Sequence, residues 1–203
     1  MENMWRGFLE GTNFRFVIFW LLRLLAVLAA IFGVFFWVGA LIQILQRFSL
    51  GLFLGGFIFL GLYLIALFAV IRTMWKRARD IQDLPAGEFP IFAIYAAVVR
   101  LVGETSAIIL AFIGVGGMFL IWGAGRLSLD IIGFLIRPIL PLFGPYSLMD
   151  PIGTLTAGLV VFTVYVVSAV LTLLGSYFLA ELVILIKGIF HNTQSLQKET
   201  NQG

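Results

Sequence analysis

The sequence has no cysteine, and among its 203 residues there is a single histidine, His191. Without cysteine the chain has no disulfide, no thiolate nucleophile and no sulfur ligands for an iron–sulfur cluster, and one imidazole does not build a zinc or haem site by itself. Charged residues make up only 11% of the chain. We therefore expect no metal, no other cofactor and no enzymatic activity.

Sequence motifs for nucleotide binding or hydrolysis are also missing. The glycine-rich stretch Gly114-Val115-Gly116-Gly117 lacks the spacing, the preceding strand and the acidic residue of a dinucleotide-binding fingerprint. No P-loop, H-E-x-x-H or G-x-S-x-G pattern occurs. The net charge of +3 comes without a basic tract long enough to follow a phosphate backbone, so nucleic acid is not an expected partner.

What the sequence does contain is apolar residues, at 62% of the chain and with a mean hydropathy of +1.10. These values are typical of an integral membrane protein, whose first partner is the lipid bilayer. A bilayer core requires about 20 apolar residues in a helix, and four runs of this kind lie between charged boundaries. The sequence thus predicts an all-α chain with four transmembrane helices, at Leu24–Ile44, Leu50–Ile71, Glu104–Gly123 and Leu155–Lys187.

We expect the four spans to form two hairpins in a single transmembrane domain covering residues 1–203. The predicted segments are a first hairpin at 14–72, a cytoplasmic loop at 73–90, a second hairpin at 91–190 that includes an outer loop at 124–151, and a polar tail at 191–203. The outer loop, between helices 3 and 4, is rich in proline and glycine. A cap on the outer surface is favoured there over a re-entrant hairpin, because Asp130 and Arg137 avoid hydrocarbon.

The basic residues indicate the orientation of the helices. With four spans both termini lie on one side, and cytoplasmic loops of membrane proteins carry an excess of Lys and Arg. The side with the termini holds nine basic residues and the other side three, which predicts N-in and C-in topology. We expect the membrane to be a bacterial inner membrane, although the charges do not indicate the organism. The nine are Arg6, Arg15, Arg23, Arg72, Lys76, Arg77, Arg79, Lys187 and Lys198, and the three are Arg47, Arg126 and Arg137.

Apolar residues also precede two of the predicted spans, at 14–22 and 89–99. Together with the end of the fourth helix, these lead-ins exceed the length that a bilayer core accommodates. Interfacial helices in the headgroup region are the favoured interpretation. The alternative is that the lead-ins pack against a partner subunit.

Four charged residues lie inside the spans or at their edges, namely Arg23, Arg100, Glu104 and Glu181. Charge in hydrocarbon is costly unless it is paired, so we predict a candidate intramembrane polar cluster. Arg100 and Glu104 are four residues apart and favour an ion pair within one helix. Glu181 is expected to contact Arg100 or Arg23 from another helix, while Arg23 is interpreted chiefly as an interfacial anchor.

Glycines form small-residue faces on two of the spans. Gly51 and Gly55 lie four apart in the second span, and Gly114 and Gly117 lie close together in the third. Small residues allow two helix backbones to approach closely, so these four glycines are predicted helix-packing residues.

These features favour a non-catalytic integral membrane subunit that packs within, or scaffolds, a larger inner-membrane complex with other membrane subunits. The alternative is a small oligomeric channel or ion-coupled transporter that uses the intramembrane Arg and Glu residues.

Overall fold

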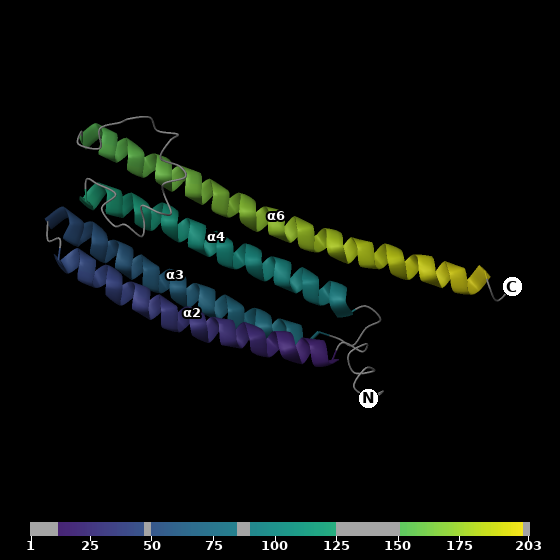
Figure 1. The fold of residues 1–203 in the computed structure, drawn as a ribbon. Helices are drawn as coiled ribbons and strands as arrows, with labels where there is room; N and C mark the ends of the chain where they lie inside the picture. Colours follow the sequence, from purple (N-terminus) through teal and green to yellow (C-terminus); the bar gives the residue numbers. More distant parts are fainter. Residues whose placement is uncertain (1–11, 47–49, 85–89, 125–150, 201–203) are drawn as a thin grey trace. The chain divides into compact units, whose positions relative to one another are not determined.

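The computed structural model describes residues 12–46, 50–84, 90–124 and 151–200, and these contain four long α-helices (Figure 1). Each helix includes a stretch that is long and apolar enough to cross a membrane. The prediction of an all-α chain with four such helices is therefore confirmed for the described residues. The predicted outer loop falls almost entirely on residues 125–150, which lie outside them. The helices are α2 (Thr12–Gln46), α3 (Leu50–Gln82), α4 (Pro90–Ala124) and α6 (Pro151–Thr200).

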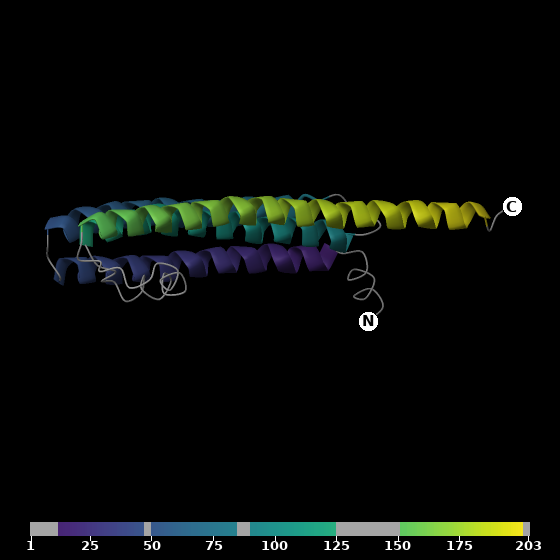
Figure 2. The same cartoon turned by 90° about the horizontal axis from the view of Figure 1, so that it is seen from above.

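All four helices extend beyond the predicted spans. Helix α3 continues to Gln82, so most of the predicted loop at 73–90 is helical. The described residues of the two apolar lead-ins are the first turns of α2 and α4, not separate interfacial helices. The ribbon of α2 runs without a break in Figure 2, and that of α4 does so in Figure 1. Pro90 suits the start of α4 because the first helical position needs no intrahelical N–H bond.

The chain divides into two compact units, and every helix contributes to both. Unit 1 consists of Met1–Ala26, Arg72–Ser106 and Thr172–Gly203. Unit 2 consists of Val27–Ile71 and Ala107–Leu171. Each unit has its own group of buried apolar side chains.

The core of unit 1 explains why the helices continue past their predicted ends. Phe19 and Leu22 of α2 are buried together with Ala78 and Ile81 of α3. Met74, Ala78 and Ile81 recur at helical spacing, so the segment after Arg72 carries one apolar face although its composition is mixed. One side of each lead-in packs in this core, to which α4 contributes Ile94 and, further along, Leu101, while side chains such as Phe16 and Ile91 remain exposed.

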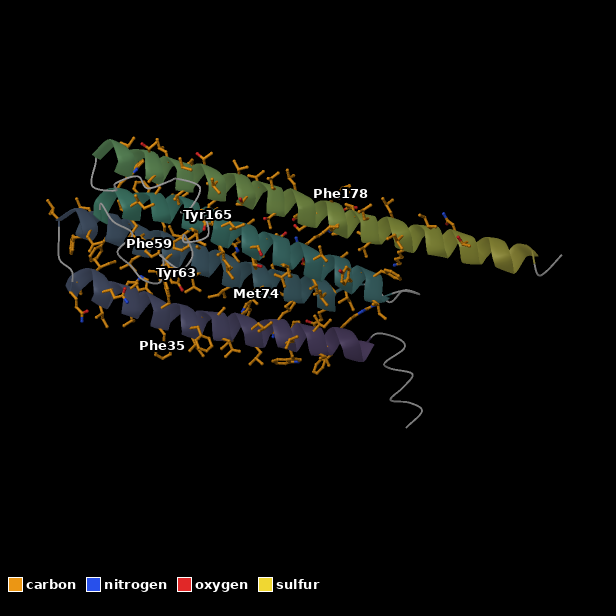
Figure 3. The ribbon with its side chains drawn as sticks, turned by 45° about the horizontal axis from the view of Figure 1, so that its top comes forward. Phe35, Phe59, Tyr63, Met74, Tyr165 and Phe178 are labelled. Atoms are coloured by element: carbon orange, nitrogen blue, oxygen red, sulfur yellow. The ribbon has the colours of Figure 1, made fainter. Side chains whose placement is uncertain are left out.

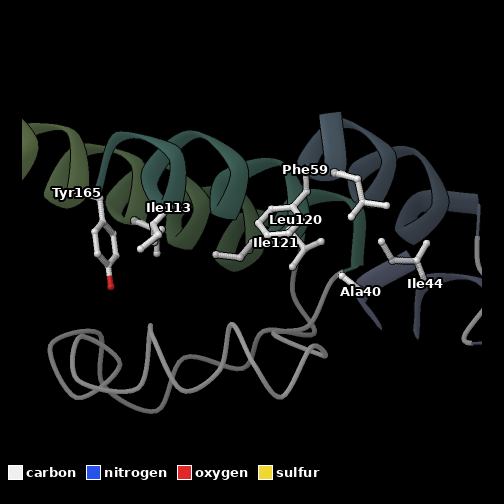
Figure 4. Packing of buried hydrophobic residues seen from close by; sticks show 9 residues of the cluster. Ala40, Ile44, Phe59, Ile113, Leu120, Ile121 and Tyr165 are labelled. Carbon is white, nitrogen blue, oxygen red and sulfur yellow. The ribbon is translucent and has the colours of Figure 1, made fainter. Parts of the chain in front are cut away.

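The core of unit 2 is built around aromatic and branched side chains from all four helices (Figure 4). Phe59 of α3 packs with Phe112 of α4 at a ring-centroid distance of 5.0 Å. Side chains that face outward are apolar in both units: Phe35 of unit 2 and Phe178 of unit 1 project away from the ribbon, as Figure 3 shows. An apolar exterior is what a helix needs in contact with lipid. The buried members are Ala40, Ile44, Phe59, Leu60, Ile113, Leu120, Ile121, Val161 and Tyr165.

Candidate functional site

The strongest polar contact in unit 1 joins Arg77 of α3 to Glu104 of α4. Arg77 Nε donates a hydrogen bond to Glu104 Oε2 at 3.0 Å, and Arg77 Nη2 donates to Oε1. Two parallel bonds between a guanidinium and a carboxylate give both strength and a fixed geometry. The two side chains are only 15% and 18% exposed, so water screens the pair weakly. Arg77 Nη1 also donates to Asp80 Oδ2, one turn along α3, at 3.2 Å.

Tyr177 brings α6 into the same group of polar side chains. Its hydroxyl donates to Glu104 Oε1 at 2.6 Å, and Arg77 Nη2 donates to the tyrosine oxygen at 3.3 Å. Glu104 therefore accepts hydrogen bonds from two neighbouring helices. We call Arg77, Glu104 and Tyr177 the polar triad; its three side chains connect α3, α4 and α6.

A second ion pair joins α4 to α6 and matches the contact expected from the sequence. Arg100 Nη2 lies 2.5 Å from Glu181 Oε1. The Arg100 guanidinium also lies 5.5 Å from the centroid of the Tyr177 ring, so this pair adjoins the polar triad. Glu181 is 60% exposed and Arg100 25%. The chain itself therefore covers the second pair much less than the first.

A close approach of two helix backbones positions the triad. A Cβ atom on Gly103 would overlap the side chain of Ser176, so α4 and α6 meet at a distance that only glycine permits there. Ser176 is buried, and its hydroxyl donates to the carbonyl of Leu173 at 2.8 Å within its own helix. Glu104 and Tyr177 are the next residues along the two helices. The contact at Gly103 therefore brings the tyrosine hydroxyl within reach of the carboxylate.

Arg23 does not join these ion pairs. Its guanidinium instead lies over aromatic rings, 4.1 Å from the centroid of Phe19 on the same helix and 5.2 Å from that of Trp75 on α3. Cation–π contacts of this kind stabilise a partly desolvated cation without neutralising its charge. Of the four predicted cluster residues, the structure thus joins Arg100 to Glu181 and leaves Arg23 outside.

Glu104 has a different partner from the one predicted. Its ion pair is with Arg77 and not with Arg100, because the guanidinium from α3 reaches both carboxylate oxygens. The sequence prediction missed Arg77 because it ended the second span at Arg72 and so put Arg77 in a loop. The helical spacing of Met74, Ala78 and Ile81 was the signal that could have placed Arg77 on a helix.

In unit 2 the predicted packing glycines of α3 lie at a very close helix contact. A Cβ on Gly55 would come within 2.5 Å of the Phe119 carbonyl oxygen and 3.1 Å of the Gly123 Cα atom on α4. A Cβ on Gly51 would overlap the Gly123 carbonyl. The two helix backbones therefore touch along this line. Gly123 is the partner that the sequence did not reveal.

The two predicted glycines of α4 have different surroundings. A Cβ on Gly114 would lie 3.0 Å from the Cβ of Tyr165, so Gly114 faces α6 at a tight contact. Gly117 is buried and lines an apolar cavity between α2, α3 and α4.

That cavity has a volume of about 510 Å³. Its walls include the rings of Phe36, Phe59 and Phe112, and none of its lining residues is charged. One hydroxyl faces it: Tyr63, which Figure 3 shows on α3, donates its proton to the carbonyl of Gly33 at 3.1 Å. The cavity is thus suited to an apolar group, and its described lining offers no charged ligand for an ion.

The chemistry open to these residues is limited. Over the parts of the chain that the structure describes, no three His, Asp or Glu side chains converge as a metal site would require. The carboxylates of Glu104 and Glu181 are both held by arginines from another helix. The arrangement therefore acts as a set of cross-links between helices. Comparison of the chain with protein-family models, with curated proteins and with solved structures finds no match.

Proposed function

We propose that the chain is a non-catalytic integral membrane subunit that packs within, or scaffolds, a larger complex. In this proposal its four helices cross a bacterial inner membrane as two hairpins, with both termini in the cytoplasm. Its partners are other membrane subunits that cover apolar surface which lipid does not reach.

The observation that carries this proposal is the length of the apolar surface on α6. Large exposed apolar side chains follow this helix from Leu155 to Ile189. At about 1.5 Å per residue this stretch is about 51 Å long. A hydrocarbon core is about 30 Å thick, and a helix tilted by about 40° crosses it in about 39 Å. Part of the surface therefore extends beyond the hydrocarbon and requires another apolar cover.

The arrangement of charge favours the same function over a channel or transporter. Glu104 is held by Arg77 and Tyr177, and Glu181 is held by Arg100. Side chains that carry an ion or a proton across a membrane must exchange partners along a polar path. Here the contacts are bonds between helices, and the described cavity in unit 2 is lined almost entirely by apolar groups.

The test compares two matched pairs of substitutions on α6. Leu185 and Ile189 lie near the end of the apolar stretch, and Leu171 and Leu174 near its middle; all four are exposed to a similar degree. We expect Leu185→Ala with Ile189→Ala to lose the subunits that co-purify with the wild-type chain in mild detergent. The pair Leu171→Ala with Leu174→Ala faces lipid and should retain them.

Two results would contradict the proposal. One is purification of the wild-type chain alone from native membranes, at its native expression level. The other is a homogeneous homo-oligomer that conducts ions in liposomes, which would favour the channel alternative. Circular dichroism of both double variants verifies that the helices are intact, so a loss of partners is not confused with unfolding.

A further inference from the structure

Three basic side chains form a line along one face of α3 in unit 1. Arg72, Lys76 and Arg79 are spaced by four and then three residues, which places them on the same side of the helix. All three are exposed. At about 1.5 Å per residue the line is about 10 Å long. We call these three residues the basic stripe.

None of the three residues of the basic stripe forms an ion pair with a carboxylate within the described ranges, although Lys76 lies near enough to Glu104 to act on it electrostatically. The ion pairs found there use Arg77 and Arg100, and these two arginines hold Glu104, Glu181 and Asp80. Asp83 is exposed one turn beyond Arg79 and offsets one charge of the stripe without forming an ion pair in the described part of the chain. The face therefore keeps a local excess of positive charge.

Arg23 adds a fourth cation beside the stripe. Its guanidinium lies 5.2 Å from the ring centroid of Trp75, which is itself exposed on α3 between Arg72 and Lys76. The Nε atom of Arg23 is buried and has no acceptor among the described residues. Arg23 therefore adds positive charge that no described carboxylate neutralises through an ion pair.

The residues that precede the stripe on the same helix are exposed and apolar. Ile65 and Phe68 lie seven and four residues before Arg72, which puts them on the same face of α3, and both are strongly exposed. The face thus changes from apolar to basic within about 6 Å, or one helical turn. A membrane phospholipid has the same order of chemistry, with acyl chains followed by a phosphate. Trp75 at this level matches the preference of tryptophan for the headgroup region.

We propose that the basic stripe, with Arg23, binds the phosphate of an anionic glycerophospholipid. The guanidinium groups of Arg72 and Arg79 supply paired donors that match phosphate oxygens, and the Lys76 ammonium supplies a single charge. Charge complementarity selects an anionic headgroup over a zwitterionic one. The site concerns the chain and its lipid alone, so it does not depend on whether the chain is a subunit of a larger complex.

The test uses the purified full-length chain in a mild non-ionic detergent. Native mass spectrometry measures how many molecules of phosphatidylglycerol remain bound, with phosphatidylcholine of the same acyl chains as the comparison. We expect the wild-type chain to prefer phosphatidylglycerol and the variant Arg72→Gln, Lys76→Gln, Arg79→Gln to bind it at least about tenfold more weakly. Arg72→Lys with Arg79→Lys keeps the charge and should retain most of the binding. Lys187→Gln removes one charge from α6 and should have no effect.

Several outcomes would overturn the assignment. Equal retention of the two lipids by the wild-type chain would do so, as would unchanged retention by the triple variant. Displacement of the lipid by millimolar inorganic phosphate would identify a site for free phosphate instead of a headgroup. Loss of a co-purifying protein from the triple variant, with lipid binding unchanged, would show that the stripe is a protein interface. Equal thermal stability of the variants in phosphatidylcholine is the check on folding.

Discussion

Units 1 and 2 are built from the same four helices but are held together in different ways. In unit 1, α3, α4 and α6 are joined by the polar triad and by the pair between Arg100 and Glu181. In unit 2, α3 and α4 are joined by the contact of Gly51 and Gly55 with the backbone of Gly123. Hydrogen bonds between charged groups require a defined orientation, whereas glycine contacts require only that nothing projects between the helices.

The two kinds of contact tolerate different substitutions. A polar cross-link fails when one partner loses its charge, because the other charge is then left desolvated. A glycine contact fails when the glycine is replaced by a larger residue, because the backbone that faces it cannot move aside as a side chain can. Loss of a charge should therefore affect unit 1 more than unit 2, whereas a larger side chain should affect the glycine contacts of unit 2 and also Gly103 in unit 1.

The largest effect is expected from Gly123→Leu in unit 2. A Cβ atom at this position would lie 2.9 Å from the Gly55 Cα atom and would overlap the Gly51 carbonyl, so α3 and α4 must separate. We expect a loss of about 3 kcal/mol in the free energy of unfolding, at the upper end of overpacking costs. Gly39→Leu is the matched control, because a Cβ on Gly39 meets nothing within 4 Å. Unfolding in a detergent titration measures both, and equal stability of the two variants would contradict the glycine contact.

A smaller loss is expected from Glu104→Gln in unit 1. The amide keeps one acceptor for Tyr177 but no longer neutralises Arg77, whose side chain is only 15% exposed. An unsatisfied group of this kind costs about 1 to 3 kcal/mol. A double-mutant cycle with Arg77→Gln isolates the pair, and we expect the double variant to be less destabilised than the sum of the two single variants. Strict additivity would show that the ion pair does not contribute to stability.

The smallest effect is expected from Glu181→Gln. A position at the membrane edge among arginines, which is all that the sequence indicates, predicts a loss of roughly 1 to 5 kcal/mol. A Glu181 that faces water at the membrane edge lowers that expectation, because the chain leaves its side chain 60% exposed and a water-exposed pair contributes less than about 1 kcal/mol. The same unfolding titration decides between the two values. A loss equal to that of Glu104→Gln would mean that Glu181 is shielded from water, for example by a partner.

The predictable part of the fold follows from composition and length. Four apolar runs bounded by charge are sufficient to locate the helices, since a bilayer core sets their minimum length. The pairing of Arg100 with Glu181 was also accessible, because counting residues inward from the helix ends puts both at a similar depth. These inferences need only the order of residues along single helices.

The remaining features depend on where one helix meets another. Gly123 looks like the end of a span until Gly51 and Gly55 are seen against its backbone. Arg77 lies in a segment of mixed polarity, and a search for long apolar runs stops at Arg72 although Ala78 and Ile81 continue the buried face. Both the full length of α3 and the pairing of Glu104 with Arg77 depend on the helical turns after Arg72, which that search leaves out. A periodicity search past Arg72 would have recovered both.

The separation of the ion-pair partners along the chain also sets an order for assembly during synthesis. Arg77 precedes Glu104 by 27 residues, whereas Arg100 precedes Glu181 by 81. At about 5 to 20 residues per second, a ribosome needs about 4 to 16 s to make the chain between Arg100 and Glu181. Once Ala124 has been made within this interval, the residues of α2, α3 and α4 are complete, and Arg100 has yet to meet its carboxylate. Docking of α6 is therefore the last step, and it satisfies Arg100 and completes the polar triad at the same moment.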